Sequence, residues 1–251
     1  MDFTNSNYIK LLNTLQSQGF SFQTLEEFIL QPKEKVVIMR HDVDRKPYNA
    51  LKMAQIEKEL SVSASYYFRT VEGVYNEEVI NQIKMLGHEV GYHYENMDTC
   101  NGNYEDAYSD FCKNLKKLKE FYPVQTFCMH GSPMSRFDNK DLWKKYNYKE
   151  LGLIAEPYFD IDFNKVFYIT DASRAWNNEN VSVRDKVTTT YKIKINSTQD
   201  IINLALSNKM PAQIMINIHP HNWAKNHLEW AKVLLWQGIK NTIKRLVILV
   251  K

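Results

Sequence analysis

The sequence predicts an α/β fold in which about seven parallel strands form a distorted (β/α) barrel. Short runs rich in β-branched and aromatic residues alternate with segments of helical periodicity, which is typical of strand–helix units around a parallel sheet. The chain has 251 residues, a length common for one such barrel, and no Pro-, Ser- or Gly-rich linker or internal repeat interrupts it. We therefore expect residues 1–251 to form a single domain.

Runs dominated by β-branched and aromatic residues predict the strands. These runs are 36–44 (VVIMRHDVD), 64–70 (ASYYFRT), 89–95 (EVGYHYE), 126–133 (TFCMHGSP), 153–157 (LIAEP), 166–173 (VFYITDAS) and 213–220 (QIMINIHP). A further apolar run at 246–250 is interpreted as a final packed strand, in preference to a membrane attachment.

Apolar residues at helical spacing predict the helices that cover the barrel. One stripe is formed by Val79, Ile80, Ile83 and Leu86, a second by Ala107, Phe111, Leu115, Leu118 and Tyr122, and a third helix follows at 228–239. Residues 1–32 are expected to form an N-terminal helical extension of one or two short helices packed on the barrel. The polar stretch 177–200 predicts a long loop or a small hairpin at the barrel mouth.

Composition and charge exclude several classes of protein. The formal net charge of +3 is too small for a surface that follows phosphates, so no nucleic-acid partner is expected. The first residues lack the features of a signal peptide, and no apolar run approaches the ~20 residues that span a bilayer. The protein is therefore expected to be cytoplasmic, with no membrane span. Cys100, Cys112 and Cys128 show no C-x-x-C spacing, which favours reduced thiols over disulfides or a thiolate zinc site.

Ionisable residues stand near the C-terminal ends of the predicted strands. They are Asp42, Asp44, Arg69, His93, Glu95, His130, Glu156, Asp171 and His219. In a parallel barrel these ends converge on one mouth, and barrel active sites are assembled there from several strands. The pattern therefore predicts a catalytic site at this mouth.

Asp42 and Asp44 are two residues apart, so both carboxylates point to one face of a regular strand. Near a metal ion, one carboxylate can bind the cation while the other acts as an ionised general base. An isolated D-x-D more often marks a turn or a helix cap. The histidines at the ends of other strands favour the catalytic interpretation here.

His93 and His130 are candidate metal ligands because neutral imidazole binds zinc and related divalent ions. A single histidine on a strand is more often a core residue, so the argument depends on the whole group. His88 and His227 are interpreted as structural. Trp176 and Trp223 follow strands at the mouth, where an indole could stack on a sugar ring, although aromatic residues are core residues by default.

These motifs resemble those of the polysaccharide deacetylase family, the NodB-homology group that includes carbohydrate esterase family 4. The matching segments are R-H-D-V-D (40–44), G-H-E-V-G-Y-H (87–93), H-G-S-P (130–133), D-A-S-R-A-W (171–176) and I-N-I-H (216–219). The resemblance implies a metal-dependent removal of an acyl group from an amino sugar. It also implies that one aspartate is the base, that the other aspartate and a histidine of the second motif bind the metal, and that the last motif supplies a general-acid histidine.

The chain departs from the family pattern at two positions. Val43 separates acids that are usually adjacent, and Met97 stands where the second metal-binding histidine usually lies. The third ligand is therefore either His130 or Glu95. The H-D-V-D and M-H-G-S-P segments are similar to a divergent branch associated with bacterial surface-polysaccharide gene clusters.

The resulting hypothesis assigns a role to each candidate. One divalent ion, expected to be zinc, is held by Asp44, His93 and His130. Asp42 is the general base and His219 the general acid. Supporting or substrate-binding roles fall to Arg69, Glu95, Glu156, Asp171, Arg174 and Trp176: Asp171 would orient His219, and Arg69 or Arg174 would hold Asp42 or bind a substrate carboxylate or phosphate. The expected substrate is a nucleotide-linked or lipid-linked amino sugar of O-antigen or capsule biosynthesis.

Other functions remain open on the sequence. Met97 favours a catalytically silent sugar-binding module that has lost its metal. The D-V-D segment would suit a glycosyltransferase-like enzyme that binds a nucleotide sugar through manganese, but no Gly-rich phosphate loop follows the first long strand. Serine hydrolysis through Ser132 is disfavoured, because H-G-S-P is not G-x-S-x-G and Pro133 has no backbone N–H.

Overall fold

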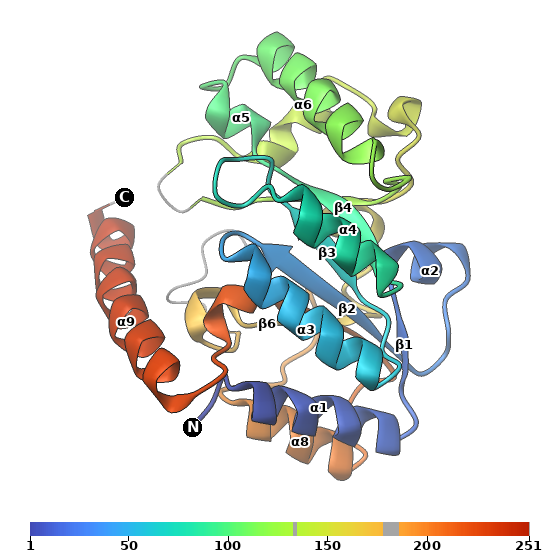
Figure 1. Ribbon diagram of the computed structural model, residues 1–251, viewed down its shortest axis with the longest axis vertical. Coiled ribbons are helices and arrows are strands. Elements are labelled where there is room, and N and C mark those ends of the chain that lie inside the picture. The colour runs from blue at the N-terminus through green and yellow to red at the C-terminus, as the bar shows by residue number, and fades with distance from the viewer. Residues whose placement is uncertain (133–134, 178–185, 251) are drawn as a thin grey trace.

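The computed structural model describes residues 1–132, 135–177 and 186–250, and a seven-stranded parallel sheet lies at its centre (Figure 1). The strands are β1 (Ser21–Gln23), β2 (Val36–Val43), β3 (Ser65–Phe68), β4 (Glu89–Tyr94), β5 (Phe127–Met129), β6 (Phe167–Thr170) and β7 (Gln213–Ile218). Their order is β5-β4-β3-β2-β7-β6, and every strand pair is parallel. The predicted α/β fold with a parallel sheet is therefore confirmed.

The barrel is open rather than closed by strand pairing. Within the described residues, β5 and β6 lie at the two ends of the sheet and share no ladder. The predicted strand at 153–157 is wrong, since it is reduced to an isolated bridge between Ala155 and Thr126. The reason is local: Glu156 caps the short helix α7 (Pro157–Asp160), which starts at a proline.

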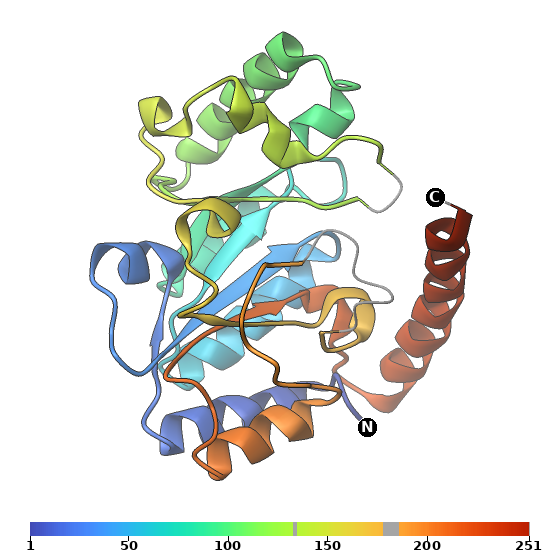
Figure 2. The same cartoon turned by 180° about the vertical axis from the view of Figure 1, so that it is seen from behind.

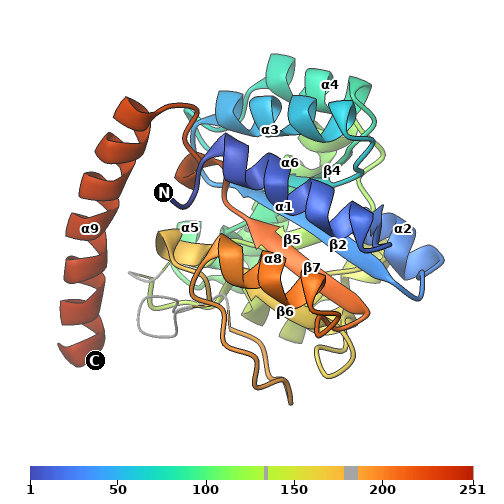
Figure 3. The ribbon, with the colours of Figure 1, turned by 90° about the horizontal axis from the view of Figure 1, so that it is seen from below.

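The N-terminal extension contains a strand as well as the two predicted helices. Helix α1 (Asn5–Ser17) and helix α2 (Leu25–Leu30) flank β1, which pairs with the first residues of β2. Three residues are too few to show a period, so β1 could not be recognised from its pattern. Figures 1 and 3 both show α1 beside α8, and the two helices are in contact.

The remaining helices connect successive strands, except α9, which follows the last strand, β7. They are α3 (Pro47–Glu59), α4 (Glu77–Met85), α5 (Asn96–Thr99), α6 (Tyr104–Lys119), α8 (Thr198–Leu206) and α9 (His227–Val250), with 3₁₀ turns at Asn139–Lys144, Tyr148–Leu151, Ala172–Arg174 and Pro220–Asn222. The helices predicted from the stripes near residues 80 and 115 are present as α4 and α6. Helices α3 and α8 were not predicted; α3 begins at Pro47, where a proline is favourable in a first turn.

Strand β2 divides the core into two parts. Val36 and Ile38 belong to a smaller apolar cluster on one face of the sheet, whereas Val37 belongs to the larger cluster on the face covered by α3 and α4 (Figure 1). Because side chains alternate along a strand, the following residues Arg40 and Asp42 point to the same face as Ile38. The inner face of β2 therefore changes from apolar to charged at its carboxyl end.

The outer face of β2 carries a buried polar network centred on Glu57 of α3. Its carboxylate accepts hydrogen bonds from Tyr8 and from Tyr66, the latter at 2.5 Å, and lies 2.6 Å from His41 Nε2. His88, interpreted as structural, is buried there as well, with Nε2 3.0 Å from Ala54 O. Burial raises the pKa of Glu57, but His41 and the other partners outweigh it and lower that pKa.

The C-terminal run 246–250 does not form the predicted packed strand. It is the end of α9, a 24-residue helix that lies apart from the sheet in Figures 1, 2 and 3. The first turns of α9 contact the body, where Trp230 Nε1 donates to the backbone carbonyl of Asp2 at 2.7 Å. In the described part of the chain, we find no helix with the length and apolar character needed to cross a membrane.

The polar stretch 177–200 is a loop only in part. Residues 178–185 lie outside the described residues, and 186–197 contain neither helix nor strand. Helix α8 then begins at Thr198, with a capping box formed by Ser197 and Asp200. The sequence S-T-Q-D (197–200) has the pattern of a capping box, so the start of α8 could have been predicted from it.

We expect Glu57→Gln to lower the free energy of unfolding by about 3 kcal/mol at neutral pH, because it removes the charge from a buried, fully bonded carboxylate. The matched control is Glu59→Gln at an exposed position of the same helix. Urea denaturation measures both variants. Since folding lowers the pKa of Glu57, its charge stabilises the folded state at pH values above the ordinary pKa of glutamate. This stabilisation is lost as the pH falls through the lowered pKa. Equal stability of the two variants would contradict this prediction.

Candidate metal centre

The candidate residues meet at the carboxyl ends of the strands, as a parallel sheet requires. Asp42 lies at the end of β2 and Asp44 just beyond it, while His93 lies near the end of β4. His130 directly follows β5, and His219 directly follows β7. Within this region, Asp44, His93 and His130 form a group that could hold a metal ion, since one donor atom from each lies within 4.8 Å of the others.

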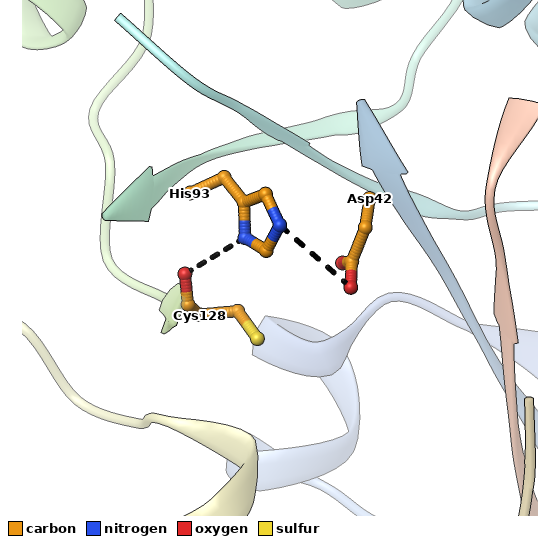
Figure 4. A group of neighbouring side chains, drawn as sticks. All are labelled: Asp42, His93 and Cys128. Atoms are coloured by element: carbon orange, nitrogen blue, oxygen red, sulfur yellow. Dashed lines mark hydrogen bonds and ion pairs between the residues drawn. The ribbon is translucent and has the colours of Figure 1, made fainter. Parts of the chain in front are cut away.

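The orientation of His93 is fixed by a backbone carbonyl. Its Nδ1 lies 2.9 Å from the carbonyl oxygen of Cys128 on the neighbouring strand (Figure 4). A carbonyl oxygen can only accept, so Nδ1 carries the proton and the neutral ring presents a lone pair at Nε2. This Nε2 lies 3.3 Å from Asp44 Oδ1. Two acceptors therefore face each other unless a proton or a cation lies between them.

His130 presents its Nε2 atom to the same oxygen. Its Nδ1 lies 3.2 Å from Glu95 Oε2, and its Nε2 lies 3.6 Å from Asp44 Oδ1. Glu95 is held in turn by Arg69, whose Nε and Nη2 donate to the two carboxylate oxygens at 2.8 and 2.7 Å. Burial raises the pKa of Glu95, but His130 and Arg69 outweigh it and lower the pKa to about 2. An ionised Glu95 thus orients His130, an arrangement common behind metal-binding histidines.

Asp44 provides the third donor atom. Its Oδ1 is buried and has no hydrogen-bond partner in the described residues, although the carboxylate is ionised. Burial raises the pKa of Asp44, but His130, followed by His93, holds it well below the usual range. Ligand atoms that surround one zinc ion tetrahedrally at about 2.1 Å lie about 3.4 Å apart. The separations of 3.3 and 3.6 Å from Asp44 Oδ1 therefore fit a small divalent ion.

Asp42 is held by Arg40 and not by Arg69 or Arg174, the two arginines expected to do so. The Nε and Nη2 atoms of Arg40 donate to the two oxygens of Asp42 at 2.8 and 2.6 Å, and Asn217 donates to Oδ2 at 3.0 Å. Burial raises the pKa of Asp42, but Arg40, then His93, outweighs it and lowers the pKa to about 2. The spacing of Arg40 and Asp42 on one face of β2 was the signal that could have revealed this pair.

His219 is oriented by Asp171. Oδ1 of Asp171 accepts from the backbone N–H of His219 at 2.8 Å and lies 2.6 Å from its Nδ1, while Trp223 Nε1 donates to Oδ2 at 2.7 Å. His219 follows Ile218 of β7, which pairs with His41 of β2, and a charged His219 contributes to lowering the pKa of Asp42 and of Asp44. Any proton that His219 exchanges with a ligand must therefore pass through Nε2.

Three other predicted residues have different surroundings from those expected. Trp176 and Trp223 are each 2% exposed and pack against Phe3 and one another, so neither offers a face to a sugar ring. Glu156 is buried and accepts from the backbone N–H groups of Met129 and Tyr158, outside the group that could hold a metal. Burial raises the pKa of Glu156 to about 7.

Met97 does not leave a vacant ligand position. It is 3% exposed on α5 and belongs to the larger core cluster. The group around Asp44 is completed instead by His130 from β5, and Glu95 supports His130 from behind. The structure thus favours His130 over Glu95 as the third donor.

No family model and no curated protein matches this chain. Similar solved structures include a CE4 esterase of Streptococcus mutans, which is 14% identical with a TM-score of 0.47 over 92% of this chain and 89% of that one. Bacillus subtilis PdaA, a family 4 carbohydrate esterase, is 10% identical with a TM-score of 0.43 over 92% of this chain and 84% of that one. A CE4 family pseudoenzyme from Bacillus anthracis is 16% identical with a TM-score of 0.45 over 85% of this chain, which spans 63% of that protein. Similarities this distant do not assign an activity.

Asp44→Ala and His130→Ala are each expected to reduce bound metal from about one ion per chain to near none, because each removes a donor from a three-residue site. Glu95→Gln should weaken metal binding by about 10- to 100-fold, as expected for a partner behind a ligand. His227→Ala, on the exposed start of α9, is the control. Elemental analysis and equilibrium dialysis measure these values. Metal retained in both alanine variants would refute the site.

Proposed function

We propose that the protein is a metal-dependent hydrolase that removes an N-acyl group, such as acetyl, from an amino sugar. One observation carries the proposal: the Nε2 atoms of His93 and His130 converge on Asp44 Oδ1, which is buried and has no hydrogen-bond partner in the described residues. An ionised Asp42 and a His219 oriented by Asp171 lie beside this group. Metal-dependent hydrolysis of an amide uses a cation site, a base and an acid in this combination.

Asp44, His93 and His130 would hold the divalent ion, and we propose zinc because its usual donors are imidazole nitrogen and carboxylate oxygen. Such an ion, when bound, polarises a carbonyl oxygen and lowers the pKa of water. Asp42 accepts the proton of the attacking water at its carboxylate. Because Arg40 keeps Asp42 ionised, the base is available throughout the neutral pH range.

His219 supplies the proton that the departing amine needs. Water attack forms the new C–O bond, and the C–N bond breaks as the proton at His219 Nε2 moves to nitrogen. Asp171 stabilises the protonated ring through Nδ1 and fixes its direction. The two protons are therefore handled by separate groups, with Asp42 as acceptor and His219 as donor.

We further propose a phosphate-bearing substrate, either a nucleotide-linked or a lipid-linked amino sugar. Arg174 supports this idea, since the residue is 8% exposed and none of its guanidinium nitrogens has a hydrogen-bond partner in the described residues. The rings of Phe3 and Trp230 lie 5.6 and 5.2 Å from the Arg174 Cζ, and such stacked guanidinium groups bind phosphate through their edges. Resemblance to the H-D-V-D branch favours O-antigen or capsule biosynthesis as the pathway.

A silent sugar-binding module is the second candidate function. Met97, packed in the core, is the observation in its favour, because the family pattern places a histidine there. The D-x-D glycosyltransferase alternative has less support: Asp42 is engaged by Arg40, while Asp44 faces the two histidines. A manganese site shared by both aspartates would require Asp42 to leave Arg40.

Asp42→Asn and His219→Ala are expected to lower kcat for deacylation of an N-acetylated amino sugar by about 10²- to 10⁴-fold, because each removes one proton-transfer group. Bound metal should stay near the wild-type level in both, since neither residue belongs to the Asp44 group. Amine release and elemental analysis are measured together. Full activity of Asp42→Asn would refute the base assignment, and a metal-loaded wild type without hydrolysis would favour the silent module.

Arg40→Gln is expected to shift the acid limb of the pH profile of kcat/KM upward by about 1 to 3 pH units. Arg40 lowers the pKa of Asp42 to about 2, so its loss lets Asp42 become protonated at higher pH. Arg136→Gln, at an exposed position, is the control, and thermal unfolding verifies that both variants fold. An unchanged acid limb would show that Asp42 is not the base.

A further inference from the structure

A second group of metal-binding side chains lies next to the first. Asp42, His93 and Cys128 also place one donor atom each within 4.8 Å of the others, and all three are buried. Figure 4 shows these side chains facing one another from three strands, β2, β4 and β5. We call this group the inner position and the Asp44–His93–His130 group the outer position.

The inner and outer positions cannot be filled at the same time. Nδ1 of His93 is engaged by the Cys128 carbonyl, so Nε2 is the donor in both groups. Nε2 lies 3.3 Å from Asp44 Oδ1 on one side and 3.9 Å from Asp42 Oδ2 on the other. One nitrogen lone pair binds one ion. His93 thus acts as a shared ligand between two alternative sites.

The two positions differ in donor type and in size. The outer position offers two nitrogens and an oxygen, which suits zinc and harder divalent ions, whereas the inner position includes a sulfur. Its wider separation of 3.9 Å between Asp42 and His93 suits a larger ion. We propose that the inner position binds large thiophilic divalent ions, of which cadmium is the probe.

Arg40 does not prevent a cation from binding at the inner position. Its guanidinium offsets the charge of Asp42, but a metal-bound Cys128 loses its thiol proton and adds a negative charge. Asp42 accepts two hydrogen bonds at Oδ2 and one at Oδ1, so one of the about four acceptor directions of the carboxylate, at Oδ1, is left for an ion. Before an ion binds, the inner position with Arg40 and the protonated thiol is neutral, whereas the outer position carries the negative charge of Asp44. Loss of the thiol proton brings the inner position to the same net charge of minus one.

Binding at the inner position follows a balanced step. The divalent ion forms a bond to the Cys128 sulfur, the thiol proton is released to solvent, and no oxidant or reductant is needed. The ion also occupies Asp42 and the shared Nε2 of His93. If the proposed function holds, such an ion both displaces the catalytic metal and removes the base, so cadmium inhibits deacylation in competition with zinc.

Spectroscopy of the metal-free protein tests this proposal without a substrate. Cadmium is titrated while the thiolate-to-cadmium absorption in the ultraviolet, bound metal and released protons are followed. We expect one ion and one proton per chain with a thiolate band in the wild type and in His130→Ala. In Cys128→Ser and Cys128→Ala the band should vanish and cadmium affinity should fall by more than about 100-fold. Such a loss exceeds the effect of removing a residue that only supports a metal ligand.

Cys100→Ser and Cys112→Ser are the matched controls, because both thiols lie outside the group. Both should keep the band. The Cys128 variants should still bind zinc, which shows that they are folded and that the outer position is intact. A band that persists without Cys128, two cadmium ions per chain, or a band that depends on His130 would overturn the proposal. None of these outcomes depends on hydrolysis, so failure of the proposed function is seen separately as zinc binding without activity.

Discussion

The hydrogen bond from His93 to the carbonyl of Cys128 determines the charge pattern of the whole site. A backbone acceptor takes no proton, so it commits Nδ1 to donating and leaves the lone pair at Nε2. Asp44 then faces an acceptor at 3.3 Å, which is unfavourable unless a cation joins them. Glu95 likewise orients His130 from the other side. The affinity for a positive ion thus arises from fixed hydrogen bonds behind the donor atoms.

Much of the site was accessible from the sequence because parallel strands end at one edge of a sheet. Asp42, Asp44, His93 and His219 could each be placed there from the position of an ionisable residue after an apolar run. His130 could be placed there in the same way, and the gap that Met97 makes in a known motif led to its assignment as the third donor. The period-two pattern and the family resemblance therefore gave independent support to the same group of residues.

What the sequence could not reveal depends on contacts between distant segments. Trp176 is a core residue and not a surface residue because Phe3, near the N-terminus, stacks on its ring. The run at 246–250 has the composition of a strand, yet it continues α9 without a strand partner in the described residues. A fully apolar run of five residues fits either structure, so periodicity alone cannot decide between them.

The different polar partners on the two faces of β2 determine how this strand is aligned in the sheet. Residues 36–39 are apolar and fully buried on both faces, so hydrophobic burial alone would tolerate a shift by one residue. Such a shift would move Asp42 to the face of Glu57 and place two carboxylates together, while His41 would turn away from Glu57. The polar half of β2 thus selects one register. The strand that holds the proposed catalytic base is therefore also the strand whose polar contacts fix the pairing with its neighbours.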